Sequence, residues 1–250
     1  MTAPNGAAMA RLTALRTTPR QERGRAKLAR IIAAADQIMA AEGADAVTTT
    51  RLAADAGVSV GTVYRYLPHR GAVIEALAQH YLGLLEEQLE SLIDAFEAGA
   101  WGQDDLAGDA VDAFAEFYRT HPGFRALWFG RHLTAETREL DRAHKHTMAS
   151  RLAVLVAHGT GLDGDQLPRV SQVMQLATDA VIQEAFRVDP DGDEALLRQL
   201  KTMIRGYVAA LAAAPPSSSA AAIRGVQPEP AGSDPDARPV PRGGRMPGEP

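Results

Sequence analysis

The 250-residue chain is rich in hydrophobic residues (46%) and poor in aromatic ones (5%), a composition that favours helices over strands. It contains no cysteine, which excludes disulfides, thiolate metal sites and a cysteine nucleophile, and fits a reducing compartment. No run of about 18 uncharged apolar residues occurs, and no apolar signal-peptide core stands near Met1. We therefore expect a cytoplasmic protein that does not enter a membrane.

The net charge of −5 argues at first against a nucleic-acid partner, but the charges are unevenly distributed. Seven basic residues lie between Arg11 and Arg30, where Glu22 is the only acid, and the acidic residues gather later in the chain. A basic end on an acidic body is compatible with phosphate binding at that end. Residues 1–22 show no apolar periodicity, so we interpret them as a disordered basic arm. Such an arm can contact DNA phosphates, or its charges can simply be solvated.

The first predicted helix runs from Gly24 to Glu42 and ends before Gly43. Its apolar face consists of Leu28, Ile31, Ile32, Ala35, Ile38 and Met39. Two shorter helices follow. Thr49 is the predicted cap of a helix from Thr50 to Ala56, and Ser59 is the predicted cap of a helix from Val60 to Tyr66.

Gly57 lies between these two helices, where the chain reverses and a positive φ costs glycine little. An inner face is expected from Leu52, Ala53, Ala56, Val58 and Val63. The residues left on the outside are Thr50, Val60, Gly61, Thr62, Tyr64, Arg65 and Tyr66. Two short helices, a glycine turn and an exposed polar and aromatic second helix are typical of a helix-turn-helix.

Here the sequence resembles the tetracycline-repressor family of bacterial regulators, from about Arg25 to Ala78. The match runs through Thr49-x-x-Leu52-Ala53-x-x-Ala56-Gly57-Val58-Ser59-x-Gly61-Thr62-Val63-Tyr64-x-Tyr66-Leu67-Pro68-x-Arg70. Leu67 replaces the usual Phe and Arg70 the usual Lys, and both keep the physical role. The resemblance implies an all-α fold. A three-helix DNA-binding domain over residues 23–70 would be joined to a helical effector-binding and dimerisation domain over 71–213.

The resemblance also implies roles for individual residues at the DNA. Backbone phosphates would be held by Thr49, Tyr64, Tyr66 and Arg70. Base edges would be faced by Thr50, Val60, Gly61 and Arg65, and Ser59 and Thr62 complete the predicted DNA-binding set. Arg65 is the candidate for a bidentate bond to guanine, with a plain phosphate contact as the alternative. Tyr64 can also be half-buried packing whose hydroxyl reaches a phosphate.

Six further segments of the body are predicted from apolar periodicity and its breaks. They run over Ala72–Phe96, Asp104–Thr120, Phe124–His132, Thr134–His158, Gln166–Arg187 and Glu194–Ala213. The first of them would join the DNA-binding head to the body. Residues 214–250 are rich in Pro, Gly, Ser and Ala and have almost no large apolar side chain, so we expect a disordered tail.

The resemblance implies a homodimer formed by the last two long helices, both of which carry strong apolar stripes; internal core is the alternative reading of those stripes. One short recognition helix reads too few bases to be selective, whereas two helices about 34–36 Å apart read a palindrome. The expected partner is therefore a pseudo-palindromic operator in double-stranded DNA.

A pocket for a small-molecule effector is suggested by a group of aromatic residues in the central body, although simple core is the alternative. The group consists of Phe114, Phe117, Tyr118, Trp128, Phe129 and His132. No metal, cofactor or catalytic constellation is predicted, since His144 and His146 point to different faces of one helix and no phosphate-binding glycine loop occurs. The prediction is a repressor released by an effector. An activator or ligand-independent regulator of the same fold is the first alternative, and a helical interaction protein without operator binding is the second.

Overall fold

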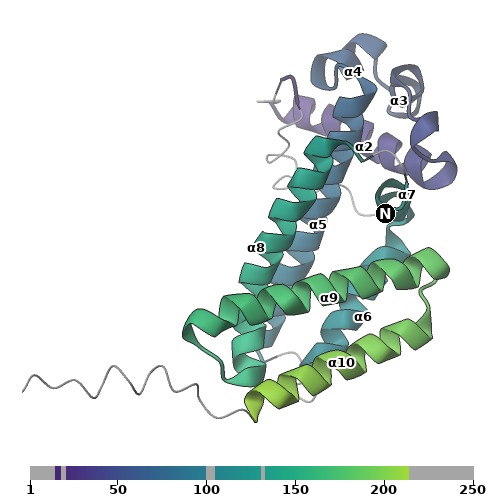
Figure 1. Ribbon diagram of the computed structural model, residues 1–250. Helices are drawn as coiled ribbons and strands as arrows, with labels where there is room; N and C mark the ends of the chain where they lie inside the picture. Colours follow the sequence, from purple (N-terminus) through teal and green to yellow (C-terminus); the bar gives the residue numbers. More distant parts are fainter. Residues whose placement is uncertain (1–14, 18–20, 100–104, 131–132, 214–250) are drawn as a thin grey trace, which may run out of the picture. The chain divides into compact units, whose positions relative to one another are not determined.

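The computed structural model describes residues 15–17, 21–99, 105–130 and 133–213, which form one packed unit of helices (Figure 1). Within these ranges there is no strand, and the predicted all-α fold is confirmed. The helices are α2 (Glu22–Glu42), α3 (Thr49–Asp55), α4 (Val60–Tyr66), α5 (Arg70–Glu97), α6 (Leu106–Thr120), α7 (Pro122–Trp128), α8 (Ala135–Thr160), α9 (Leu167–Val188) and α10 (Glu194–Ala212). Two short 3₁₀ turns, Ala44–Ala46 and Gly164–Gln166, complete the described elements. None of the described helices is both long and apolar enough to cross a membrane.

Most of the predicted arm (1–14 and 18–20), the whole predicted tail (214–250) and the candidate ligand residue His132 lie outside the described residues. In the described part, several helix ends differ from the prediction by one or two residues. The largest difference is α7, expected from Phe124 to His132. It begins at Pro122, because proline suits the first position of a helix, and it ends at Trp128.

The head is built from α2, α3 and α4, and α2 supplies most of its core. Leu28 and Ile31 of α2 and Leu52 of α3 are each 0% exposed. Burial of such side chains contributes about 1.5–3 kcal/mol each. The apolar spacing of α2 thus brings the two short helices onto one face, as the sequence predicts.

The caps of the two short helices show one error in the prediction. The expected cap Thr49 is the first helical residue of α3, and its neighbour Thr48 is the cap. Thr48 has extended backbone angles, and its side chain accepts a hydrogen bond from the Arg51 amide. Ser59 caps α4 as predicted and accepts from the Thr62 amide at 3.2 Å. Gly57 has a φ of +60°, which a residue with a side chain adopts only at a cost.

The long helix α5 leaves the head and packs against α8 in the body, where α9 packs on α8 and α10 packs on α9 (Figure 1). The expected start of α5 at Ala72 is two residues late, because His69 caps the helix and its Nδ1 accepts from the Ala72 amide at 3.0 Å. The predicted cap of α8 is confirmed, since the Thr134 side chain accepts from the Thr137 amide at 3.1 Å.

A second connection between head and body is made by α7, which packs against α2 although the two are far apart in sequence. At this contact the Tyr81 hydroxyl of α5 donates a hydrogen bond to Oδ1 of Asp36 in α2. Gly123 of α7 lies against both groups, and a Cβ at this position would overlap the Asp36 carboxylate and the Tyr81 hydroxyl. Glycine is therefore required here for close approach of the helices rather than for a turn.

Candidate nucleic-acid interface and body pocket

The outer face of α4 is the most accessible part of the head. Val60 is 39% and Tyr64 48% exposed, and Gly61 and Arg65 are exposed beside them. Thr50 is exposed on the adjoining α3. Apolar, aromatic and guanidinium groups are thus presented together on one short helix. This arrangement can offer a donor, an apolar contact and close backbone approach to a groove of DNA.

Two predicted phosphate-binding residues, Thr49 and Tyr64, are brought together by the packing of α3 on α4. The Thr49 hydroxyl donates to the Tyr64 hydroxyl over 3.4 Å, a long bond between exposed groups. Two hydroxyls so placed lie close enough to bind one phosphate oxygen jointly. Ser59 and Thr62 also share a bond, 2.9 Å between their hydroxyl oxygens, and so brace the start of α4.

The expectation that Tyr66 lies on the outside is wrong, because its side chain is only 4% exposed. Tyr66 follows Val63 by three residues, so the two occupy the same inward face of α4. Its hydroxyl accepts a hydrogen bond from Nη2 of Arg65 at 3.2 Å, and the Arg65 guanidinium carbon lies 4.9 Å from the ring centroid. Tyr66 is therefore a support that holds Arg65 against a buried ring.

The head contains further cations with existing partners. Arg70 at the start of α5 forms an exposed ion pair with Asp45 at 2.6 Å. Arg51 binds the carboxylate of Glu42 through two nitrogens and lies 3.7 Å from Asp55. The hydrogen bond from Arg51 lowers the pKa of Glu42. Exposed pairs of this kind contribute little to stability, so breaking them to bind a phosphate would cost little.

One residue of the predicted arm is also attached to the head. The Arg16 amide donates to the Tyr66 carbonyl at 3.0 Å, at the end of α4. In the sequence, only its place in a basic run distinguishes this residue. The contact could not be foreseen from periodicity, because it joins an irregular segment to a helix end.

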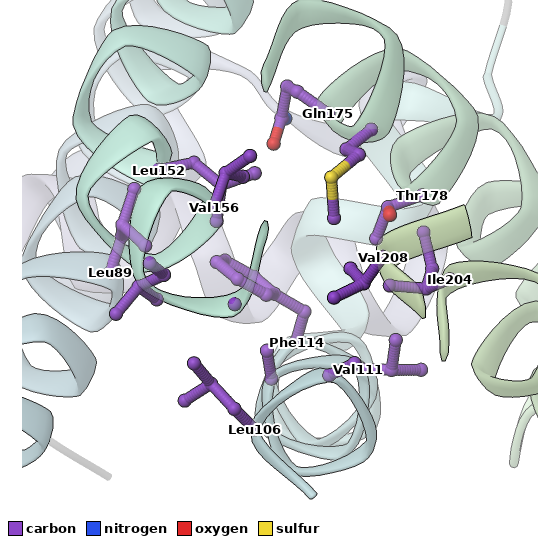
Figure 2. A pocket seen from close by; sticks show the side chains of 15 residues that line it. Leu89, Leu106, Val111, Phe114, Leu152, Val156, Gln175, Thr178, Ile204 and Val208 are labelled. Atoms are coloured by element: carbon purple, nitrogen blue, oxygen red, sulfur yellow. The ribbon is translucent and has the colours of Figure 1, made fainter. Parts of the chain in front are cut away.

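The body contains an apolar hollow of about 100 Å³ where α5, α6, α8, α9 and α10 converge (Figure 2). Fifteen of the described residues form its wall, and all of them except Gln175 and Thr178 are apolar. They are Leu89, Leu106, Ala107, Ala110, Val111, Phe114, Leu152, Leu155, Val156, Gly159, Met174, Gln175, Thr178, Ile204 and Val208. Of the predicted ligand residues in the described part of the chain, only Phe114 lines this hollow.

A smaller hollow of about 40 Å³ adjoins the first and shares Phe114, Gln175 and Thr178 with it. The predicted ligand residues Tyr118 and Trp128 line this second hollow. Phe117 lines neither of the two; it is buried and stacks on His121. Phe129 also lines neither, and its ring stacks on Tyr118 at 6.4 Å between centroids. Most of the aromatic group therefore packs around Phe124 as core.

The charges at the second hollow are already paired. Lys145 lies 2.8 Å from Asp141 and 2.9 Å from Asp179. Burial alone would lower the pKa of Lys145, but the two carboxylates outweigh it and the pKa is raised. Trp128 donates to Asp141 at 3.3 Å and Gln183 donates to Asp179 at 2.8 Å. In the described part of the chain, no group of three or more His, Asp or Glu side chains is suited to hold a metal ion.

Comparison with known proteins identifies the family. Residues 31–77 match the family described as bacterial regulatory proteins, tetR family, and residues 102–212 match the tetracyclin repressor-like C-terminal domain. The crystal structure of a TetR-family transcriptional regulator from Streptomyces coelicolor is 32% identical, with a TM-score of 0.54. The match covers 74% of this chain and 99% of that one. The chain belongs to the tetracycline-repressor (TetR) family.

A second solved structure agrees on the fold of this TetR-family chain, and curated proteins match part of its sequence. A putative transcriptional regulator from Pseudomonas aeruginosa PAO1 has a TM-score of 0.53 at 18% identity, covering 76% of this chain and 93% of that one. The nucleoid occlusion factor SlmA of Haemophilus ducreyi is 35% identical over 103 residues, which are 40% of this chain and 47% of SlmA. The uncharacterized HTH-type transcriptional regulator YerO of Bacillus subtilis is 25% identical over 150 residues, 55% of this chain and 48% of YerO. The chain thus spans just under half the length of these curated relatives.

The TetR-family assignment gives the two regions their general roles. The match over residues 31–77 contains α3 and α4, so the exposed face of α4 belongs to the DNA-binding domain of a transcriptional regulator. The match over residues 102–212 contains the helices α6 to α10, which form most of the wall of the larger hollow. Members of the family are regulators rather than enzymes, and they bind operator DNA and dimerise.

Proposed function

We propose that this TetR-family regulator is a repressor that occupies a palindromic operator as a homodimer and leaves it when a small molecule binds in the body. The observation that carries the proposal is the exposed face of α4, with Val60, Gly61, Tyr64 and Arg65 side by side. Side chains of these types supply the base and backbone contacts that a recognition helix needs. The function requires the protein to lie in the cytoplasm, on the nucleoid while it is bound.

Each exposed group has a role in this proposal. Arg65 reads guanine through two hydrogen bonds, Val60 meets a thymine methyl, and Gly61 lets the α4 backbone approach the base pairs. Thr49 and Tyr64 bind one phosphate together, as their mutual bond supports. Arg70 binds a phosphate by giving up its exposed partner Asp45. Tyr66 contributes indirectly, through its contact with Arg65.

Dimerisation through α9 and α10 is supported by apolar side chains that the single chain leaves exposed. On α9, Val173 is 53% and Leu176 48% exposed, and on α10 Met203 is 45% exposed. Gly206 follows Met203 by three residues and is also exposed, so a partner helix can approach closely. Two copies joined here would form a four-helix arrangement about a two-fold axis.

The proposal is tested by measuring binding of the purified protein to DNA from beside its own coding region at several salt concentrations. A specific complex of two protomers is expected, with affinity that falls as salt rises. Arg65→Ala and Tyr64→Ala should each weaken it, Arg65→Ala by about 1–3 kcal/mol with relaxed sequence preference. Arg142→Ala removes the same charge from an exposed position of α8 and is the matched control.

Two results would contradict the proposal. One is equal binding to random DNA together with no enriched motif in a selection over genomic fragments. The other is a specific complex that Arg65→Ala and Arg142→Ala weaken to the same extent, because the charge of the protein rather than the face of α4 would then account for binding.

A further inference from the structure

The larger hollow has two polar groups in an otherwise apolar wall. Gln175 and Thr178 lie one turn apart on α9, and Figure 2 shows both side chains reaching the hollow from that helix. Neither the Gln175 amide nor the Thr178 hydroxyl has a hydrogen-bond partner among the described residues. Both residues are half-buried and neither polar group is a buried atom without a partner, so water reaches both of them. A bound molecule with a hydrogen-bonding oxygen can take the place of that water.

We propose that this hollow binds a small uncharged molecule with an apolar body and one hydrogen-bonding oxygen, which Gln175 and Thr178 hold. The inference rests on the proposed function, because it assigns a chemical class to the effector. The amide and the hydroxyl each offer both a donor and an acceptor. An alcohol oxygen can therefore accept from one side chain and donate to the other.

The requirement for an uncharged molecule follows from the wall. None of the described residues that line the larger hollow is charged. Charged residues do line the adjoining second hollow, where Lys145 is already bound by Asp141 and Asp179. A carboxylate or an ammonium group in the larger hollow would lose its hydration and gain no opposite charge. We therefore expect an acid or an amine to bind more weakly than an alcohol of the same length.

The size of the hollow limits the apolar body. A volume of about 100 Å³ is smaller than the engineered cavity of about 150 Å³ that binds benzene. A short aliphatic chain of about five carbons fits this space without movement of the wall. Larger molecules of the same class would have to push α6 away from α9 and α10.

The position of the hollow connects a bound molecule to the head through α6 and α7. Phe114 and Val111 of α6 form one side of the wall. α6 ends at Thr120, and only His121 separates it from Pro122 at the start of α7, which packs on α2 of the head. A molecule that displaces α6 therefore moves a helix attached to α2, while its polar end is held on a helix of the proposed dimer interface.

The test uses the full chain and 1-pentanol as the probe, with pentanoate and pentylamine as charged molecules of equal length, in titrations followed by calorimetry at pH 7. Saturable binding of 1-pentanol at one site per protomer is expected, with at least tenfold weaker binding of both charged probes. Thr178→Val and Gln175→Met should each weaken 1-pentanol about threefold to tenfold, because each removes one hydrogen bond. Thr147→Val, at an exposed position of α8, should leave the affinity unchanged.

Ala110→Leu fills part of the hollow and should abolish binding; if that variant does not fold, Ala107→Val serves in its place. Absence of saturable binding, equal affinity for pentanoate, or affinity unchanged in both polar variants would each overturn the inference. The operator complex is titrated separately. Because 1-pentanol fits without moving α6, the release step is tested with 1-octanol, which is too long for the hollow unless α6 moves. If 1-octanol binds but does not release DNA, the site assignment stands and the release step of the proposed function fails.

Discussion

Tyr81→Phe provides a quantitative test of the junction between head and body. Tyr81 is 1% exposed, and its hydroxyl donates to Oδ1 of Asp36. A hydrogen bond to a charged group contributes about 1.5–3 kcal/mol. Asp36 is only half-buried, so water replaces part of the lost bond, and the lower end of this range applies. We expect the free energy of unfolding to fall by about 1.5–2 kcal/mol at pH 7.

The same substitution has a second, pH-dependent effect. Burial, with the Asp36 charge and hydrogen bond added to it, raises the pKa of Tyr81 far above its ordinary value. In the unfolded chain the tyrosine ionises near pH 10. Above that pH the unfolded state binds fewer protons than the folded state, so stability falls as pH rises. Phenylalanine does not titrate. The deficit of Tyr81→Phe relative to the wild type should therefore shrink by about 1.4 kcal/mol between pH 7 and pH 11.

The assay is urea unfolding followed by circular dichroism, at one fixed protomer concentration because dimer stability depends on concentration. Tyr207→Phe is the matched control, since Tyr207 is half-buried and its hydroxyl has no hydrogen-bond partner among the described residues. It should change the free energy of unfolding by less than about 0.5 kcal/mol. The reasoning would be refuted by an equally small effect of Tyr81→Phe at pH 7. It would also be refuted by a deficit that is the same at pH 7 and pH 11.

Three further changes have direct readouts. Gly123→Ala should lower the free energy of unfolding by about 1–3 kcal/mol in the same urea assay, because the new Cβ overlaps Asp36 and Tyr81; an unchanged midpoint would contradict the close contact. Gly57→Ala should cost about 1–2 kcal/mol, since φ is +60° although a Cβ there meets only Arg30 at 3.7 Å; a neutral result would show that the turn relaxes. Leu176→Glu places a charge on the exposed face of α9 and should give monomers by sedimentation velocity; a persistent dimer would place the interface elsewhere.

The fold of the head could be predicted because the residues that determine it lie close together in the sequence. Apolar spacing along α2, a glycine between two short runs and a serine before Val60 specify three elements that follow one another in the chain between Glu22 and Tyr66. The errors were also local. Thr48 and Thr49 are both capable caps, and only backbone angles distinguish them. Tyr66 was placed outside although its spacing from Val63 indicates the inward face.

The pocket could not be predicted in the same way. The aromatic residues of the body were the chosen candidates, yet Phe117 and Tyr118 are 4% and 3% exposed and pack around Phe124. The larger hollow is lined by aliphatic residues whose positions depend on how α5, α6, α8, α9 and α10 cross. One signal was present: Gln175 and Thr178 interrupt the apolar stripe of α9 beside Met174. Polar residues within such a stripe are therefore the sequence feature that indicates the wall of this hollow.

The contact of Asp36, Tyr81 and Gly123 limits how this regulator can be recombined with others. A chimera that joins residues 23–70 to another body would remove the hydroxyl that binds Asp36 and the helix that covers α2. In the chimera, α2 would then expose apolar surface, and Asp36 would lose its hydrogen bond from the buried Tyr81 hydroxyl. A functional exchange must therefore carry α5 and α7 with the head, or rebuild their contact surfaces in the recipient. In this protein the smallest segment that can be transferred without losing these contacts is therefore longer than residues 23–70, the predicted DNA-binding domain.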